Sequence, residues 1–152
     1  MLRRAGLQAL LALLELAQAP ECWRSVTSIA EAQQLPAPML EQLLLQLRRS
    51  GLLEARRGRL GGYRLARSPA TIAVAEVLRA VGADLGCTPT LEALSDGWDQ
   101  ENRAERRVLQ SMARRLQSAL EKEMQTLSLE ELLFDLSSWQ ESLSNEGGVM
   151  LG

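Results

Sequence analysis

A mainly α-helical protein with one small β-hairpin and a long C-terminal helix is the fold that this sequence predicts. Three observations predict it. Leucines recur at helical spacing before residue 50, glycines separate two strand-like runs within 52–67, and apolar residues recur every three or four positions from Trp98 to Leu127. We expect a domain over residues 1–82, a loop over 83–97, a helical region over 98–143 and a disordered tail over 144–152.

The first predicted helix runs from Leu2 to Ala19. Pro20 ends it, because proline disfavours the helical conformation of the residue before it. Leucines recur along it at helical spacing, which predicts an amphipathic helix: Leu7, Leu10, Leu11 and Leu14. No uninterrupted apolar run approaches the roughly 18 residues that a membrane span needs, so we expect no membrane association.

A short second helix, from Val26 to Gln34 with Ser25 as its N-cap, precedes a third helix that begins within Leu35-Pro36-Ala37-Pro38. The third helix has one apolar face, formed by Leu40, Leu43, Leu44 and Leu47. The face opposite carries Pro38, Gln42, Leu45 and Arg49, flanked by Glu41, Gln46 and Arg48. A short helix, a turn and a helix with an outward polar face is the helix-turn-helix order, although any small helical bundle shares this pattern.

A predicted hairpin follows the third helix directly. Ser50-Gly51 ends the helix, and the strands Leu52 to Arg56 and Tyr63 to Arg67 are separated by a turn that holds Gly58, Gly61 and Gly62. Between Arg48 and Arg67 there are seven arginines and one acid. A cationic hairpin directly after a helix-turn-helix is typical of the wing of a DNA-binding domain, and the alternative is an ordinary solvated hairpin.

The second half of the chain is predicted to be helical and acidic. We expect a short helix from Ile72 to Val81, a loop from Gly82 to Gly97 with one helical turn at Leu91 to Leu94, and a last helix from Leu129 to Leu143. The long helix before it has an apolar stripe, for which we expect a partner in a second copy of the chain; packing within one chain is the alternative. The predicted dimer interface consists of Leu109, Met112, Leu116, Leu120, Met124 and Leu127.

Charge and composition restrict the classes of function that we expect for this chain. Residues 1–67 hold ten arginines and five acids, whereas residues 68–152 hold seven basic and fourteen acidic residues. This asymmetry favours contact of the first half with a polyanion. The chain has no histidine and no phosphate-binding glycine motif, so we expect no catalytic residue and no enzyme activity. Two cysteines, Cys22 and Cys87, indicate a reducing compartment, and we expect a cytoplasmic protein.

The segment from Ile29 to Arg67 resembles the Rrf-two (Rrf2) family of bacterial winged-helix transcriptional regulators. The specific parts are the LEQ of Leu40 to Gln42, the LRRSGLL of Leu47 to Leu53 and the RGRLGGYRLAR of Arg57 to Arg67. The resemblance covers about residues 5 to 82 and the long helix in outline. It implies a homodimer that reads a pseudo-palindromic promoter, with recognition residues at Glu41 and Gln42 and a wing arginine at Arg57.

The chain departs from the cluster-binding members of this family. Those members place three cysteines in the loop after the helix that ends near Gly82, whereas this chain has Cys87 alone there. Iron–sulfur clusters are normally held by four protein ligands. We therefore expect no cofactor and no metal site. A cluster bridged between two copies of Cys87, redox sensing by Cys87, and a loop thiol without function are the alternatives.

The sequence therefore predicts a dimeric regulator that binds double-stranded promoter DNA. The expected DNA contacts are Pro38, Glu41, Gln42, Arg48, Arg49, Arg57, Arg59 and Arg64. The alternative is a protein-interaction adaptor that kept the scaffold and lost DNA reading, with the acidic second half and Trp139 as its docking surface.

Overall fold

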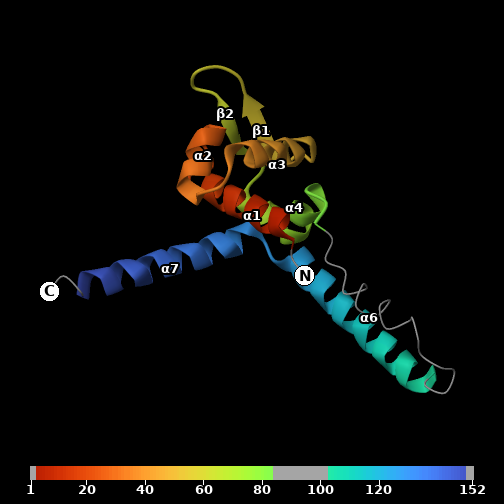
Figure 1. Ribbon diagram of the computed structural model, residues 1–152. Helices are drawn as coiled ribbons and strands as arrows, with labels where there is room; N and C mark the ends of the chain where they lie inside the picture. Colours follow the sequence, from red (N-terminus) through yellow and green to blue (C-terminus); the bar gives the residue numbers. More distant parts are fainter. Residues whose placement is uncertain (1–2, 84–102, 150–152) are drawn as a thin grey trace.

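The computed structural model describes residues 3–83 and 103–149 of the chain. In Figure 1, the N-terminal helices form a body that carries a hairpin at one end, and two long helices diverge from the opposite end. This arrangement confirms the predicted fold class, a helical protein with a two-stranded wing. No helix in the described ranges combines the length and the apolar character that crossing a bilayer requires.

Helix α1 (Arg4–Ala17) lies at the centre of the body, in contact with α2, α3, β2, α4 and α7. Its Ala9 and Ala12 are fully buried, and small side chains there let the neighbouring elements approach closely. Gly6 serves the same purpose, because a Cβ at this position would lie 2.6 Å from a methyl group of Leu78 on α4. The helix ends two residues before the predicted Ala19, in a turn that leads to Pro20.

Helices α2 (Val26–Gln33) and α3 (Ala37–Arg49) form the helix-turn-helix. The predicted N-cap is confirmed, since the Ser28 amide donates to Ser25 Oγ at 3.1 Å. Gln34 has a φ of 53° and ends α2 in the left-handed conformation. The predicted inward face of α3 is buried, with Leu40, Leu43, Leu44 and Leu47 all at most 6% exposed.

Strands β1 (Leu53–Arg56) and β2 (Gly62–Leu65) pair antiparallel, with Leu53 opposite Leu65. Gly58 in the connection has a φ of 108°, a conformation that L side chains rarely adopt. The second strand ends two residues before the predicted Arg67, because the chain bends after Leu65 toward the 3-10 helix η1 (Pro69–Thr71).

Helix α4 (Val74–Ala80) begins two residues after the predicted start at Ile72. Ile72 and Ala73 are extended instead, because they pair with the joint between the last two helices. The Leu129 amide donates to the Ile72 carbonyl at 2.8 Å, and the Val74 amide donates to the Leu127 carbonyl at 2.9 Å. The sequence pattern of α4 did not indicate this pairing, which attaches the C-terminal helices to the body.

Helices α6 (Arg103–Thr126) and α7 (Leu129–Val149) extend away from the body in different directions (Figure 1). Ser128 between them forms a capping box: its Oγ accepts from the Glu131 amide at 3.2 Å, and its own amide donates to Glu131 at 3.0 Å. The prediction of a disordered tail over 144–152 is wrong for residues 144–149, since α7 continues to Val149. A nucleated helix adds one hydrogen bond per residue, and no proline interrupts this stretch.

Candidate nucleic-acid interface

The outward face of α3 carries three of the residues that were predicted to contact DNA. Pro38, Glu41 and Gln42 are all exposed, and the helix turns its leucines into the core behind them. Pro38 lies in the first turn, where its missing N–H leaves no helical hydrogen bond unmade. This face therefore offers a carboxylate and a carboxamide to an outside partner, on a helix whose position the buried leucines fix.

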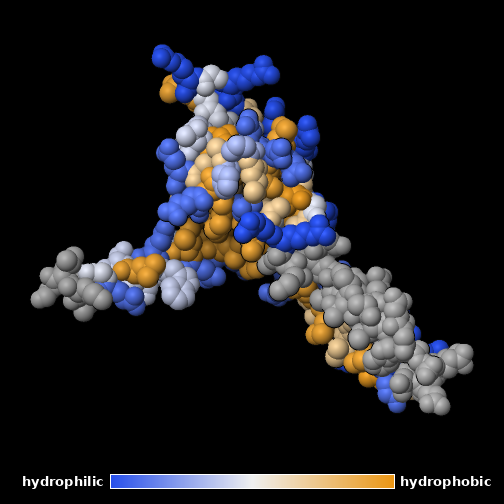
Figure 2. Space-filling model, viewed as in Figure 1, coloured by the Kyte–Doolittle hydropathy of each residue, from blue (hydrophilic) through white to orange (hydrophobic). Residues whose placement is uncertain are grey.

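Four arginines beside this face are exposed. Arg48 and Arg49 end α3, where a cation also interacts favourably with the helix dipole, and Arg57 and Arg59 lie at the tip of the hairpin. Among the described residues, none of these four forms an ion pair with an acid. Figure 2 shows hydrophilic side chains projecting around the hairpin. The interface thus presents guanidinium groups that no acid of the described chain neutralises.

Arg64, which was predicted to contact the partner, is held within the protein. Its Nε donates to Glu54 on the adjacent strand at 3.0 Å, and its side chain is 33% exposed. The guanidinium carbon lies 4.4 Å from the centre of the Trp23 ring. Arg64 therefore differs from the four exposed arginines, because two neighbours orient it before any partner arrives.

Trp23 also belongs to this surface, although no sequence pattern singled it out. The guanidinium carbon of Arg56 lies 4.7 Å from the same ring, and Arg56 also donates to the Leu60 carbonyl at 2.6 Å. The neighbouring Arg24 forms an antiparallel bridge with Tyr63, so the loop before α2 pairs with the outer edge of β2. No local sequence signal indicated this, because the bridge joins segments that are far apart in the chain.

Glu76 joins the hairpin to α4. The Arg67 guanidinium donates to it at 2.9 Å, and the Ala73 amide donates to it at 3.1 Å, which is half of a capping box. Burial raises the pKa of the Glu76 carboxyl, but these two hydrogen bonds and the charges of Arg67 and Arg79 lower this pKa by more. The Glu76 carboxylate therefore stays ionised to a lower pH than an ordinary glutamate. Its hydrogen bonds fix the segment that follows the hairpin.

A second candidate surface lies on α6, far from the hairpin. Val108, Met112 and Leu116 are 66%, 48% and 56% exposed, and Figure 2 shows apolar surface along this helix. Val108 was not predicted, although it precedes Met112 by one helical turn. Leu109 is only half-exposed.

The predicted stripe of α6 does not continue unchanged to its C-terminal end. Met124 is 7% exposed in the core of its own chain, and Leu120 and Leu127 pack partly against that core. Burial within the chain thus accounts for these three residues, because the end of α6 lies against α4.

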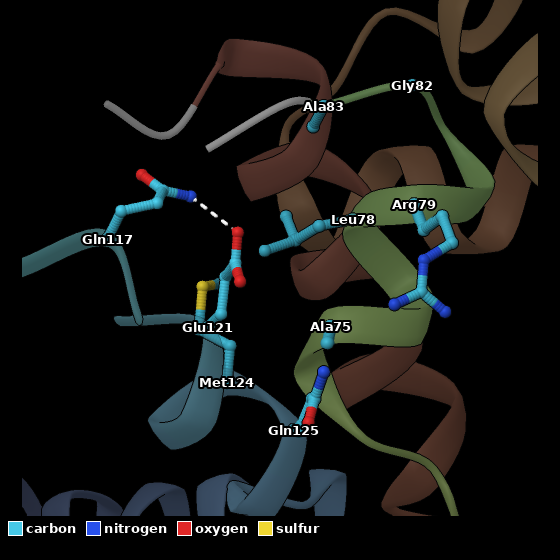
Figure 3. A pocket seen from close by; sticks show the side chains of 9 residues that line it. All are labelled: Ala75, Leu78, Arg79, Gly82, Ala83, Gln117, Glu121, Met124 and Gln125. Carbon is cyan, nitrogen blue, oxygen red and sulfur yellow. Dashed lines mark hydrogen bonds between the residues drawn. The ribbon is translucent and has the colours of Figure 1, made fainter. Parts of the chain in front are cut away.

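A groove of about 490 Å³ separates α4 from α6 (Figure 3). Ala75, Leu78 and Arg79 line it from α4, and Gln117, Glu121 and Met124 line it from α6. Gln117 donates to Glu121 at 2.8 Å across one helical turn. The groove combines an apolar floor with charges of both signs.

The residues that a metal site needs do not gather in the described ranges. Within them, no three histidine, cysteine or acidic residues lie close enough to hold a metal ion. Cys22 is a free, exposed thiol. Cys87, the predicted redox or cluster thiol, and the predicted turn at Leu91 to Leu94 lie outside the described residues.

Comparison with protein families assigns residues 2–135 to the family described as Rrf2, an iron-dependent transcriptional regulator. A putative HTH-type transcriptional regulator of Synechocystis sp. is 38% identical over 130 residues, which cover 85% of this chain and 84% of that relative. The HTH-type transcriptional regulator IscR of Cereibacter sphaeroides is 41% identical over 95 residues, which cover 60% of this chain and 61% of that protein.

Solved structures show the same architecture. The structure of T. potens IscR matches with a TM-score of 0.71 at 30% identity, over 92% of this chain and 90% of that one. CymR of B. subtilis, described as the global cysteine regulator, matches with a TM-score of 0.65 at 27% identity, over 88% of this chain and 95% of that one.

Proposed function

Since this chain belongs to the Rrf2 family of transcriptional regulators, we propose that it is a homodimer that reads a promoter sequence in duplex DNA with α3 and the hairpin. The observation that carries the proposal is the set of four exposed arginines beside the polar face of α3, without an acid partner in the described chain. On this proposal the protein acts in the cytoplasm, has no catalytic role, and does its work through DNA binding.

The arginines supply affinity. A guanidinium group forks onto phosphate oxygens and displaces condensed counterions, which makes binding steeply dependent on salt. Arg48 and Arg49 are placed at the C-terminal end of α3 for backbone contacts, whereas Arg57 and Arg59 at the hairpin tip suit the backbone or the minor groove. These contacts set the register of α3 on the duplex and carry little sequence information themselves.

The exposed face of α3 supplies sequence information. The carboxamide of Gln42 can pair bidentately with adenine in the major groove, and the carboxylate of Glu41 can accept from the N4 amino group of cytosine. Pro38 lies one turn before Gln42 on the same face and fits apolar contact with a thymine methyl group. The buried leucines behind this face keep the helix from rotating as it docks.

The exposed stripe of α6 supports the proposed dimer. Val108, Met112 and Leu116 recur at four-residue spacing and present apolar surface that a second copy of the helix would cover. Leu109 lies beside the stripe, whereas Leu120, Met124 and Leu127 serve the core of their own chain. A two-fold pair places two hairpins on one side of the duplex, with half-sites about one helical turn apart.

The family description names iron dependence, and the donor set of this chain does not fit an iron–sulfur cluster as its source. The chain has no histidine and two cysteines, and Cys22 lies in the connection between α1 and α2. A cluster held in the usual way needs four protein ligands, mostly thiolates. We therefore propose regulation without a cluster, and anaerobic purification that yields iron and sulfide with an absorbing chromophore would contradict this.

The decisive experiment measures binding of the protein to a duplex that holds its own upstream region, at several salt concentrations. Replacing Arg57 by alanine should weaken binding and reduce the slope of log K against log salt by about one. Arg79→Ala removes an exposed arginine on α4 and should leave affinity and slope unchanged. If Arg57→Ala behaves like Arg79→Ala, the hairpin does not contact DNA.

A protein-interaction adaptor is the second candidate. The acidic helix α7 favours it, because Phe134, Trp139 and Leu143 are 73%, 67% and 62% exposed there. Absence of salt-dependent binding by the wild-type protein to any duplex would favour this adaptor over the DNA-binding regulator.

A further inference from the structure

The loop before α2 pairs with the outer edge of β2. The Arg24 amide donates to the Tyr63 carbonyl at 2.9 Å, and the Tyr63 amide donates to the Arg24 carbonyl at 2.8 Å. Gly62 permits this approach, because a Cβ there would lie 2.2 Å from the Arg24 carbonyl oxygen. With Arg24 opposite Tyr63 in an antiparallel pair, Trp23 comes opposite Arg64.

Side chains on α1 and α2 hold the loop in place. Arg24 Nη1 donates to Glu15 Oε1 at 2.9 Å, and Arg24 Nε donates to Ser28 Oγ at 2.9 Å. Gln33 donates to the other Glu15 oxygen at 2.7 Å. Arg24 is therefore engaged within the protein, and its position fixes the backbone of Trp23 relative to the body.

One face of the hairpin and the paired loop carries Trp23, Arg64 and Glu54 side by side. Arg64 on β2 lies opposite Glu54 on one side and opposite Trp23 on the other. Arg56 belongs to the same face, since it follows Glu54 by two residues along β1. The ring of Trp23 contacts both guanidinium groups, at 4.7 Å from Arg56 and 4.4 Å from Arg64.

We propose that Trp23 is a positioning residue for DNA recognition, which holds the guanidinium groups of Arg56 and Arg64 in one orientation so that the hairpin meets the phosphate backbone already ordered. The proposal rests on the DNA-binding function proposed above. An arginine loses rotamer freedom when it binds a phosphate, and a side chain that is already stacked has less freedom left to lose. Trp23 itself need not touch the nucleic acid.

Replacement of Trp23 by leucine keeps an apolar side chain and every positive charge, but removes the aromatic face. We expect affinity for the duplex to fall about 5- to 10-fold, because the two arginine side chains must then be ordered when the protein binds. The salt slope should stay unchanged, because the number of phosphates neutralised is the same. Trp23→Phe should lie between wild type and Trp23→Leu, since phenylalanine keeps a weaker π face.

A double-mutant cycle separates positioning from simple packing. Arg64→Lys keeps the charge but loses the planar group that stacks, so it should weaken binding similarly to Trp23→Leu. If Trp23 acts through Arg64, the double variant should lose clearly less than the product of the two single losses. In contrast, Trp23→Leu combined with Arg49→Lys should be multiplicative, because Arg49 lies at the end of α3 and does not stack on the ring.

Binding is measured at a temperature at which circular dichroism shows every variant to be folded, so that a change in stability alone does not move the result. Trp139→Leu makes the same replacement on α7 and should leave affinity unchanged. If the wild type binds the duplex and Trp23→Leu binds it equally tightly, the proposed role of Trp23 is wrong. The same conclusion follows if the losses of Trp23→Leu and Arg64→Lys multiply in the double variant. Absence of salt-dependent binding by the wild type would instead overturn the proposed function.

Discussion

Single residues in this protein take their roles from contacts across the fold. Arg64 and Arg57 illustrate this, since both are hairpin arginines, yet Arg64 is oriented by Glu54 and Trp23 whereas Arg57 is exposed. Glu76 is a carboxylate that three neighbours define: the Ala73 amide, Arg67 and Arg79. Its lowered pKa makes it a residue whose contribution depends on pH.

Glu76 should stabilise the protein at neutral pH and lose this effect in acid. Because its pKa in the folded state lies below the ordinary value of 4.5, its contribution is present above that value and is lost as the pH falls through the folded pKa. The partly exposed site limits the effect to about 1 kcal/mol or less. Glu76→Gln should lower the free energy of unfolding at pH 7 but leave it close to that of wild type at low pH.

Urea unfolding of both proteins from pH 7 down to pH 3 checks this. Glu121→Gln is a suitable control, because Glu121 lies on α6 away from Arg67. A difference between wild type and Glu76→Gln that stays constant across the pH range would contradict the assigned ion pair.

At the scale of elements, the hairpin is attached to the body by more than its two ends. The Arg24–Tyr63 bridge pairs it with the loop before α2, and this contact requires glycine at position 62. Helix α3 depends instead on its own leucine face, which is buried along its whole length. The two proposed DNA-reading elements are therefore positioned by different means, one by apolar burial and the other by backbone pairing.

Gly62→Ala should destabilise the protein by about 2 kcal/mol or more, because the new Cβ meets the Arg24 backbone at 2.2 Å and the residue has a φ of 140°. Gly58→Ala provides the matched control. Gly58 has a φ of 108°, but a Cβ added there would meet nothing within 4 Å, so only backbone strain of about 1 kcal/mol is expected. Equal losses in chemical denaturation would mean that the loop does not pack closely on the hairpin.

At the scale of the whole molecule, the hairpin and the exposed apolar stripe lie at opposite ends. The hairpin is at one end of the body, whereas α6 and α7 diverge from the other (Figure 1). Their joint is fixed by the hydrogen bonds of Ile72 and Val74 with Leu129 and Leu127. A second copy that joined along α6 would leave both hairpins accessible, which suits the proposed two-fold reading of DNA.

Leu116→Glu should convert the proposed dimer to a monomer, because it places a charge within the exposed stripe between two copies. The side chain is 56% exposed in one chain, so the monomer itself should change in stability by no more than about 0.5 kcal/mol. Light scattering coupled to size-exclusion chromatography measures the mass. Leu60→Glu, at a hairpin residue that is 83% exposed, should remain dimeric, and a dimeric Leu116→Glu would contradict the proposed interface.

Local signals in the amino-acid sequence were enough to define several elements. The leucine spacing of α3 predicted its buried face, Ser25 predicted the cap of α2, and the glycines predicted the hairpin between two short strands. These predictions hold because helical periodicity, capping and positive φ depend on residues within a few positions of one another.

Contacts between segments far apart in the chain became visible only in the folded protein. They place Trp23 opposite Arg64 and bury Met124 in the core of its own chain. They also delay the start of α4, because Ile72 and Ala73 pair with the joint of the last two helices. A backbone pair between distant segments leaves no periodic trace in either one, since each edge offers the same amides and carbonyls whatever its side chains.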